Sequence, residues 1–279
     1  MNILHCGHFR LSLARPLVMG IVNLTPDSFS SDGLADDLER AVVHARHQLD
    51  AGADILDIGA ESSRPGAMPT PEEEELRRLL PLLERIASWG VPISVDTYKP
   101  AVMRAALAAG ATMINDIAGL RTPGALEAVQ DSDCAVCLMH MQGEPGSMQQ
   151  APDYRDVVAE VETYLAERLA LCRQAGIVAE RLVLDPGFGF GKTLDHNLAL
   201  FRALPRLLGA GYPLLVGVSR KTMLGGMTGR PVGERLAASV AAAMLAAQKG
   251  AKILRVHDVA ATVDALKVLA AIEQGERDE

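Results

Sequence analysis

Several features that would indicate other classes of protein are scarce or missing in this sequence. No apolar run reaches the roughly 18 residues that suggest a membrane span. The opening residues, MNILHCGHFR, lack the cationic start and apolar segment of a secretory signal. We therefore expect a soluble, cytoplasmic protein with no membrane partner. The net charge is −8 and the 27 Lys and Arg residues are scattered along the chain, which argues against a nucleic-acid partner.

Cysteine is also scarce, with four in 279 residues. Cys134 and Cys137 have the spacing of a redox or zinc motif, but they lie in CAVCLMH, which is typical of a buried strand. Side chains three positions apart on a strand point to opposite faces, so we interpret both as small core residues. His44 and His47 lie one turn apart on a predicted helix, and without a third ligand we expect them to be solvated.

The sequence does contain a regular alternation of short apolar runs and helix-length amphipathic segments. This pattern is typical of parallel strands joined by helical crossovers. Eight runs occur without a linker between them: PLVMGIVN from Pro16, DILDIG from Asp54, PISVD from Pro92, TMIND from Thr112, CAVCLMH from Cys134, RLVLD from Arg181, PLLVGVS from Pro213 and KILRVHD from Lys252. They predict an α/β fold, a single (β/α)8 TIM barrel domain over residues 1–279 with an N-terminal β-hairpin around Gly7. A doubly wound open sheet is the alternative, but the Gly-rich turn that it needs after the first strand is missing.

The last residues of these predicted strands are polar. In a (β/α)8 barrel the C-terminal strand ends form the active-site face, so the polar side chains should meet at one mouth. They are Asn23, Asp57, Asp96, Asn115, Asp116, His140, Asp185, Ser219, Lys221, Arg255 and His257. Asp57 and Asp116 are candidates to pair within the protein instead. The cations suit a multiply charged anion and the acids suit a heterocycle rich in N–H donors, so we expect a phosphorylated heterocyclic substrate.

Two glycine-containing loops follow predicted strands. The loop DPGFGFGKT (185–193) resembles a phosphate-binding loop, but it leaves three residues between Gly187 and the GK pair where four are needed. Its Phe188 and Phe190 suit a wall against a flat ring, or else they plug the barrel mouth. The second loop, VGVSRKTMLGG (216–226), carries donors and cations that can hold a carboxylate-bearing second substrate.

Eight motifs occur in an order that resembles the bacterial dihydropteroate synthase family over essentially the whole chain. They are MGIVNLTPDSFSSDG, DIGAESSRPGA, ISVDTYKP, INDIAG, CLMHMQG, LDPGFGFGK, GVSRKTMLG and RVHDV. The resemblance implies a (β/α)8 barrel that joins 6-hydroxymethyl-7,8-dihydropterin diphosphate to p-aminobenzoate, giving 7,8-dihydropteroate and diphosphate in folate biosynthesis. It also implies that sulfonamides compete with p-aminobenzoate.

The resemblance further implies a role for each matching position. The catalytic residues are Asp96, Asp185, Lys221 and Arg255, and the pterin diphosphate is bound by Ser63, Asp96, Asn115, Asp185, Lys221, Arg255 and His257. The p-aminobenzoate site consists of Phe29, Arg64, Pro65, Phe190 and Ser219, and Asn23 is a ligand of Mg²⁺. The implied mechanism is dissociative: diphosphate leaves first, and the amine then attacks the pterin methylene cation. Ser63 stands where the enterobacterial form has threonine, SFSSDG replaces the expected SFSDGG, and Tyr98 is bulkier than expected.

Two other functions are consistent with a pterin-binding barrel. A methyltetrahydrofolate-dependent methyltransferase would lack the metal and phosphate features of the first loop and the Ser63 to Pro65 motif. A non-catalytic pterin-binding paralogue would have lost Asn23, Lys221 or Arg255, all of which are present.

The segment 232–250 is apolar on almost every face, whereas an outer helix of a barrel needs only one apolar face. It therefore predicts a homodimer. The alternative is an alanine-rich, helix-favouring surface.

Overall fold

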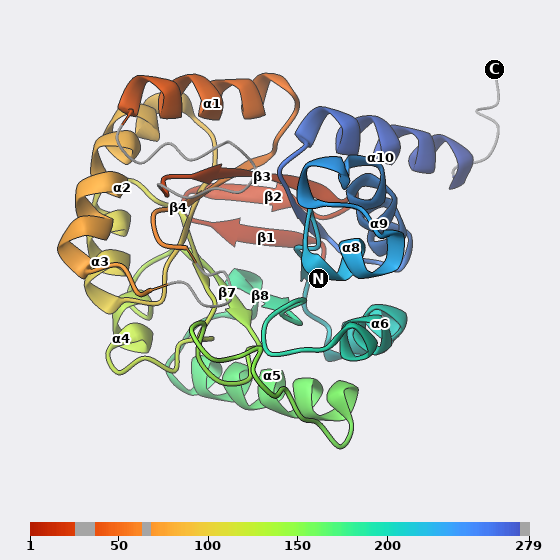
Figure 1. Ribbon diagram of the computed structural model, residues 1–279. Helices are drawn as coiled ribbons and strands as arrows, with labels where there is room; N and C mark the ends of the chain where they lie inside the picture. Colours follow the sequence, from red (N-terminus) through yellow and green to blue (C-terminus); the bar gives the residue numbers. More distant parts are fainter. Residues whose placement is uncertain (26–36, 63–67, 274–279) are drawn as a thin grey trace.

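The computed structural model describes residues 1–25, 37–62 and 68–273 and shows a barrel with a short N-terminal hairpin (Figure 1). The hairpin pairs β1 (Ile3–Cys6) with β2 (Phe9–Ser12) and turns at Gly7, whose φ of 59° suits glycine. Leu4 and Cys6 pack among the N-terminal ends of the barrel strands. The predicted hairpin is confirmed, and it covers that end of the barrel.

Eight parallel strands form the barrel wall. They are β3 (Leu17–Asn23), β4 (Ile55–Gly59), β5 (Ile93–Asp96), β6 (Met113–Asp116), β7 (Ala135–Met139), β8 (Leu182–Asp185), β9 (Leu215–Val216) and β10 (Ile253–Val256). Neighbouring strands pair in the order β8, β7, β6, β5, β4, β3, β10, β9, and a parallel bridge between Leu184 and Leu214 joins the two ends. The sheet is closed, which confirms the predicted barrel and excludes the doubly wound alternative.

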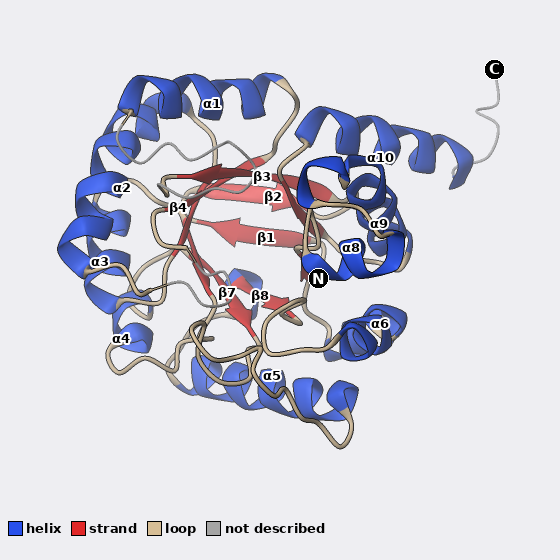
Figure 2. Cartoon of the chain, in the orientation of Figure 1, coloured by secondary structure: helices blue, strands red, loops and turns tan. Residues whose placement is uncertain are grey.

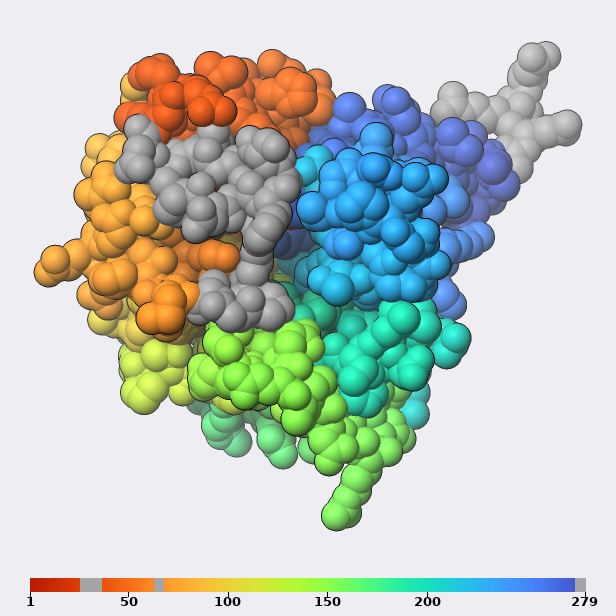
Figure 3. Space-filling view, viewed as in Figure 1, coloured from red at the N-terminus to blue at the C-terminus, as the bar shows by residue number. Residues whose placement is uncertain are grey.

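Helices cover the outer side of this wall and return the chain to the next strand (Figure 1, Figure 2). In the space-filling view they follow one another around the barrel in chain order, from orange through green to blue (Figure 3). The α-helices are α1 (Leu38–Asp50), α2 (Glu72–Ile86), α3 (Pro100–Ala108), α4 (Ala125–Val129), α5 (Val157–Gln174), α6 (Leu194–Arg202), α7 (Leu204–Leu207), α8 (Thr222–Thr228), α9 (Leu236–Gln248) and α10 (Val259–Glu273). Short 3-10 helices are η1 (Ala87–Trp89), η2 (Ala179–Arg181), η3 (Leu208–Ala210) and η4 (Val232–Glu234).

Local sequence signals explain where several helices begin. The carboxylate of Asp37 accepts the backbone N–H of Arg40 at the start of α1. At the start of α5 the carboxylate of Asp156 accepts the N–H groups of Val158 and Ala159. Such caps satisfy backbone donors that the first turn leaves unpaired. Within the described ranges, no helix combines the length and the apolar character needed to cross a membrane.

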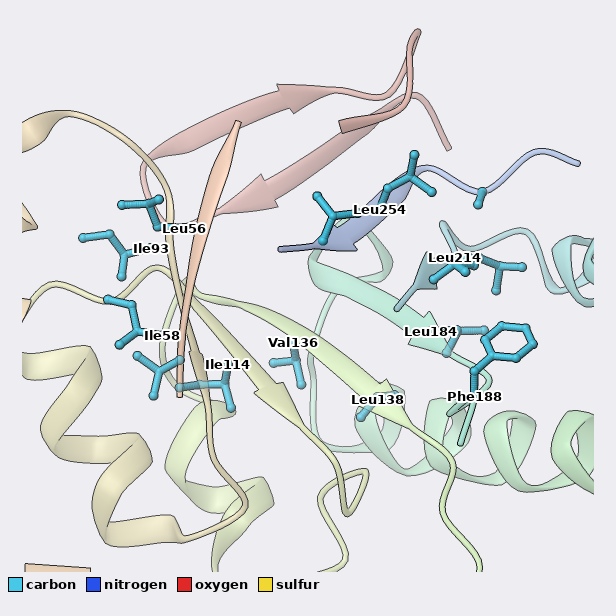
Figure 4. Packing of buried hydrophobic residues seen from close by; sticks show 14 of the residues in the cluster. Leu56, Ile58, Ile93, Ile114, Val136, Leu138, Leu184, Phe188, Leu214 and Leu254 are labelled. Carbon is cyan, nitrogen blue, oxygen red and sulfur yellow. The ribbon is translucent and has the colours of Figure 1, made fainter. Parts of the chain in front are cut away.

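Alternate side chains of each strand enter two separate cores. Those that face the helices form the outer core, part of which Figure 4 shows: Leu56, Ile58, Ile93, Ile114, Val136, Leu138, Leu184, Leu214 and Leu254. Those that face inward fill the N-terminal end of the barrel: Leu17, Met19, Ile55, Met113, Ala135, Cys137, Val183, Leu215 and Ile253. Because the side-chain period of a strand is two, residues two or four positions further along also face inward. Those positions hold the polar residues of the predicted mouth.

The structure also tests the predictions made for the cysteine pair and the histidine pair. Cys134 belongs to the outer core and Cys137 to the inner one, and both are free thiols, as predicted. The prediction that His44 is merely solvated is wrong: it is half-buried, and its Nε2 lies 3.2 Å from the carbonyl oxygen of Ile21. His44 shares the strand-facing side of α1 with the buried Gln48, whose amide donates to the same carbonyl at 3.1 Å. His47 is exposed, as expected.

Candidate active site

One row of paired residues crosses four adjacent strands at the mouth of the barrel. Asn23 pairs with Gly59, Gly59 with Asp96, and Asp96 with Asn115. A side chain at Gly59 would reach within 3.8 Å of both the Asn23 Oδ1 and the Asp96 Oδ2. The amide oxygen of Asn23 and the carboxylate of Asp96 therefore flank Gly59 on either side at the inner face of the barrel wall.

Arg255 joins two of the mouth's acids. Its Nε donates to Asp57 at 2.6 Å and its Nη2 donates to Asp96 at 2.8 Å. Burial alone lowers the pKa of the Arg255 guanidinium, but the charges of Asp57 and Asp96 outweigh it, so the net shift is upward. Burial raises the pKa of Asp96 to about 7, with Arg255 opposing the shift and Asp57 adding to it. The guanidinium stays charged, whereas Asp96 titrates near neutral pH.

The structure shows which acids pair within the protein. Asp57 is fully buried and is occupied by Arg255, while the amide of Asn115 approaches both of its carboxylate oxygens at 3.5 Å. Asp116 faces the outer side of β6 and accepts the backbone N–H groups of Ala118 and Leu120, each at 2.7 Å. Burial raises the pKa of Asp116 to about 6 against these bonds. Both acids therefore have internal partners, as the sequence suggested.

Asp185 and Lys221 form the opposite side of the mouth. The Asp185 Oδ1 accepts the Gly187 N–H at 2.7 Å, and the Lys221 ammonium donates to the Phe188 carbonyl. Burial raises the pKa of Asp185, opposed chiefly by Lys221. Burial also lowers the pKa of Lys221 to about 8, and Asp185 opposes that shift. The two charges therefore influence each other electrostatically, each opposing the effect of burial on the other.

Ser219 and His257 connect the loops that follow β9 and β10. The Ser219 hydroxyl lies 3.0 Å from the His257 Nδ1 and accepts the His257 backbone N–H at 3.2 Å. Arg220 has a φ of 58°, which a non-glycine residue rarely adopts. Its side chain pairs with Asp258 at 2.7 Å and its N–H donates to Ser239 at 2.9 Å. Sequence reasoning missed Asp258, although it directly follows the predicted site residue His257.

The two phenylalanines of the loop after β8 have different roles. Phe188 is fully buried in the outer core, where its ring lies 5.8 Å from that of Phe201, so its interpretation as a wall of the ligand site is wrong. The φ of 71° at Gly187 and 80° at Gly189 gives the chain the local turn that sends the two rings different ways. Phe190 is half-buried, packs near Met139, and lies 4.7 Å from the Lys221 ammonium. Of these two rings, Phe190 is the one that lies beside Lys221 at the mouth.

A second polar cluster lies beside Asp96, and sequence reasoning missed most of it. The Tyr98 hydroxyl donates to Glu61 at 2.9 Å, and the Lys99 ammonium binds Glu61 and donates to Glu75 at 2.6 Å. Glu61 could have been predicted from the sequence, because it follows the end of a strand in the same way as the other acids at the mouth. A small cavity at this place is lined by Glu61, Ser62, Asp96, Thr97, Tyr98, Ile117 and Pro145. The bulky Tyr98 thus occupies space beside a predicted pterin-binding carboxylate.

Some predicted site residues lie outside the described residues, namely Phe29, Ser63, Arg64, Pro65 and the shifted serine of SFSSDG. The described ones, Asn23, Asp96, Asn115, Asp185, Phe190, Ser219, Lys221, Arg255 and His257, are all at the C-terminal ends of barrel strands or in the loops that follow them. In the described part of the chain, no three His, Cys, Asp or Glu side chains gather to hold a metal ion.

A closed parallel barrel whose mouth combines acids, an amide and cations has the arrangement typical of an enzyme with its binding site at the strand ends. The comparison with known families agrees: the chain belongs to the family of pterin binding enzymes, whose family model matches residues 19–257.

Within this family the chain groups with the dihydropteroate synthases. The dihydropteroate synthase of Neisseria meningitidis serogroup C is 52% identical over 276 residues, 97% of this chain and 98% of that protein. The crystal structure of Burkholderia cenocepacia dihydropteroate synthase complexed with 7,8-dihydropteroate has a TM-score of 0.91 at 53% identity, and covers 100% of this chain and 99% of that one. The Yersinia pestis dihydropteroate synthase in a sulfonamide drug complex has a TM-score of 0.95 at 47% identity, over 98% and 100%.

Proposed function

We propose that this chain transfers the dihydropterin-methyl group of 6-hydroxymethyl-7,8-dihydropterin diphosphate to p-aminobenzoate, giving 7,8-dihydropteroate and diphosphate. The observation that carries the proposal is the convergence of Asp96, Asn115, Asp185, Lys221 and Arg255 on one interior face at one mouth. Relatives that are about half identical over nearly the full length carry the name of this activity. The reaction breaks the methylene C–O bond, forms a C–N bond, and releases the amine proton.

Asp185 and Asn115 are suited to orient the pterin ring. A carboxylate accepts two parallel N–H bonds, and Gly187 occupies only part of the capacity of the Asp185 carboxylate. The Lys221 ammonium lies 4.7 Å from the ring of Phe190 and feels the charge of this acid. A flat, N–H-rich ring that binds here would meet an acceptor on its edge and a cation beside it.

Arg255 and His257 are suited to the diphosphate, together with Ser63. The guanidinium stays charged and is held by two acids, so it offers its remaining donors in a fixed direction. The Ser219 hydroxyl fixes the orientation of the His257 ring. A cation and a donor held in this way stabilise charge on the leaving group without reorganising at the moment of reaction.

Asn23 fits a magnesium site that the substrate completes. Its Oδ1 lies beside Gly59 at the inner face of the barrel mouth, and a neutral amide oxygen is a hard ligand of the kind that Mg²⁺ accepts. Mg²⁺ keeps several waters and binds phosphate oxygens, so one protein ligand is sufficient. When bound there, the ion supplies positive charge to the departing diphosphate.

The p-aminobenzoate site is proposed to combine Phe190 and Ser219 with Phe29, Arg64 and Pro65. Phe190 presents a half-buried ring and Ser219 a hydroxyl on the neighbouring loop. We propose a dissociative order of steps, in which diphosphate departs before the amine attacks. The negative charges of Asp96 and Asp185 beside the bound ring then lower the energy of the pterin methylene cation, whose charge is spread over the ring by conjugation. Sulfonamides would compete for this second position.

The assay that tests this function measures diphosphate release from the pterin diphosphate with and without p-aminobenzoate. We expect dihydropteroate to appear in equal amount to the diphosphate, and a sulfonamide to inhibit competitively against p-aminobenzoate. Methyl transfer from methyltetrahydrofolate without diphosphate release would identify the methyltransferase alternative. Pterin binding without turnover would identify the non-catalytic paralogue.

We also propose that the chain works as a single barrel domain, in the cytoplasm, as a homodimer through α9 and α10. The two helices pack on each other, and their outer sides expose Leu236, Leu245, Val268 and Ile272. A second copy of the chain would bury these side chains, whereas the opposite side of α9 packs small residues such as Ala243 onto the barrel. Sedimentation of the wild type as a dimer, and of Leu245→Glu as a monomer, is the expected result. A monomeric wild type at micromolar concentration contradicts it.

A further inference from the structure

Lys192 is a buried lysine that the proposed reaction does not use. Its side chain is 3% exposed, and it lies at the end of the loop that follows β8. Burial lowers the pKa of its ammonium to about 7, although Asp185 opposes the shift. A buried ammonium is costly unless it is fully hydrogen-bonded, so its partners indicate what it does.

Four acceptors surround the Lys192 Nζ. In the loop after β8, it lies 2.9 Å from the Gly187 carbonyl oxygen and 3.0 Å from that of Phe190. At the end of β7, it lies 2.9 Å from the His140 Nδ1 and 3.3 Å from the His140 carbonyl oxygen. Burial and the adjacent Lys192 lower the pKa of His140 to about 3, so its ring is neutral and can accept a hydrogen bond. The ammonium therefore fastens the loop after β8 to the end of β7.

The fastened loop carries three contacts of the candidate site. The Gly187 N–H holds the Asp185 carboxylate at 2.7 Å, the Phe188 carbonyl accepts from Lys221, and the Phe190 ring faces the Lys221 ammonium. The loop also lies very close to β7, because a Cβ at Gly187 would be 1.8 Å from the His140 carbonyl oxygen. The position of this loop thus sets the position of Asp185 and of Phe190 together.

We propose that Lys192 is a positioning residue for the transfer reaction: by binding the Gly187 and Phe190 carbonyls it fixes the Asp185 carboxylate and the Phe190 ring against Lys221. The inference rests on the proposed function for the identity of the ligands. It goes beyond that function by assigning a role to a residue that no substrate needs to touch. The role is distinct from a general contribution to folding, since the bonds end on the loop that carries the site.

The test compares Lys192→Met, which keeps the chain length and removes the donors, with Lys192→Gln, which keeps two N–H donors. Lys267→Met, on the exposed side of α10, is the matched control. Calorimetry gives the affinity for the pterin diphosphate, steady-state kinetics give kcat and KM for each substrate, and thermal melting gives stability. The wild-type turnover assay is run beside them, so that failure of the proposed function is seen separately.

We expect Lys192→Met to bind the pterin diphosphate at least tenfold more weakly and to raise the KM for p-aminobenzoate, with Lys192→Gln between it and the wild type. Lys267→Met should behave as the wild type. An affinity and kcat/KM within twofold of the wild type in Lys192→Met overturns the proposal, and so does a lowered melting temperature with unchanged affinity. If Lys192→Met does not fold, Lys192→Gln decides alone: weaker binding at the wild-type melting temperature supports the role, and unchanged binding overturns it.

Discussion

The Arg255 Nη2 donates to the Asp96 Oδ2 at 2.8 Å, although the two residues are 159 positions apart in the chain. The same guanidinium donates to the fully buried Asp57. One cation therefore compensates two acids inside the barrel mouth, and removing Arg255 leaves both acids without their cation. The arrangement of both carboxylates at the mouth thus depends on a single guanidinium.

Replacing Arg255 by Met should be strongly destabilising. Removing one partner of a buried ion pair typically costs about 3–5 kcal/mol, and without Arg255 the carboxylates of Asp57 and Asp96 both lose their cation. Urea denaturation should show this loss in the free energy of unfolding. The control is Asp264→Ala, whose pair with Lys267 is exposed and should contribute less than about 1 kcal/mol. Equal effects of the two substitutions would argue against a stabilising role for the buried pair.

Replacing Asp185 by Asn should weaken pterin binding and leave the fold intact. Asparagine keeps an oxygen that accepts the Gly187 N–H, but it loses the charge and the second acceptor. A hydrogen bond to a charged group contributes about 1.5–3 kcal/mol, which corresponds to roughly 10- to 150-fold in affinity. Calorimetry with the pterin diphosphate measures the change. An unchanged affinity would remove Asp185 from the pterin site.

The pH profile of kcat/KM should be bell-shaped. Burial raises the pKa of Asp96 to about 7, so its negative charge is lost as the pH falls through 7. Burial lowers the pKa of Lys221 to about 8, so its positive charge is lost as the pH rises through 8. Asp96→Asn should abolish the acid limb, and Lys221→Arg should move the alkaline limb upward, since guanidinium stays protonated. An acid limb that persists in Asp96→Asn would belong to another group.

Replacing Gly187 by Ala should damage both stability and binding. The added Cβ would lie 1.8 Å from the His140 carbonyl oxygen, and the φ of 71° alone costs about 1–3 kcal/mol for a residue with a side chain. Gly209→Ala is the control, because nothing lies within 4 Å of its Cβ position. Thermal melting and pterin calorimetry should separate the two variants clearly. A Gly187→Ala protein that melts and binds like the control would contradict the close packing of the loop on β7.

Chelation should stop diphosphate release, and added Mg²⁺ should restore it. Asn23→Ala should raise the Mg²⁺ concentration needed for half-maximal rate, because it removes the protein's proposed ligand. Pterin affinity measured without the metal should change little in this variant. A metal requirement identical to that of the wild type would place the ion's protein ligand elsewhere.

The strands and most of the mouth could be predicted from the sequence. In a (β/α)8 barrel the residues at the C-terminal end of every strand lie at the same end of the barrel, so their position in the chain predicts where they lie. Each of the eight apolar runs became a strand, and polar residues such as Asp185 and Arg255 lie at or near the strand ends where the pattern put them. Asp57 was also recognisable as a residue with an internal partner. Two general rules were sufficient for these predictions. Side chains alternate between the two faces of a strand, and the active site of this fold lies at the C-terminal ends of the strands.

The contacts made through loops and helix faces could not be predicted in the same way. Phe188 and Phe190 are two positions apart, yet one lies in the outer core and the other faces Lys221, because Gly187 and Gly189 take positive φ angles. The spacing around Lys192 only excluded a phosphate-binding loop and did not predict its contacts, since its partners include backbone carbonyls whose directions depend on the same turns. His44 appeared solvated because helical spacing does not reveal which strand carbonyl it will meet.

The N-terminal hairpin closes one end of the barrel. Leu4 and Cys6 belong to the same apolar cluster as Met113 and Ile253, so this end is filled with side chains and a small molecule cannot pass along the barrel axis. Reactants and products therefore share a single rim, so that exchange of the small molecules is controlled by the loops around it and not by passage through the molecule.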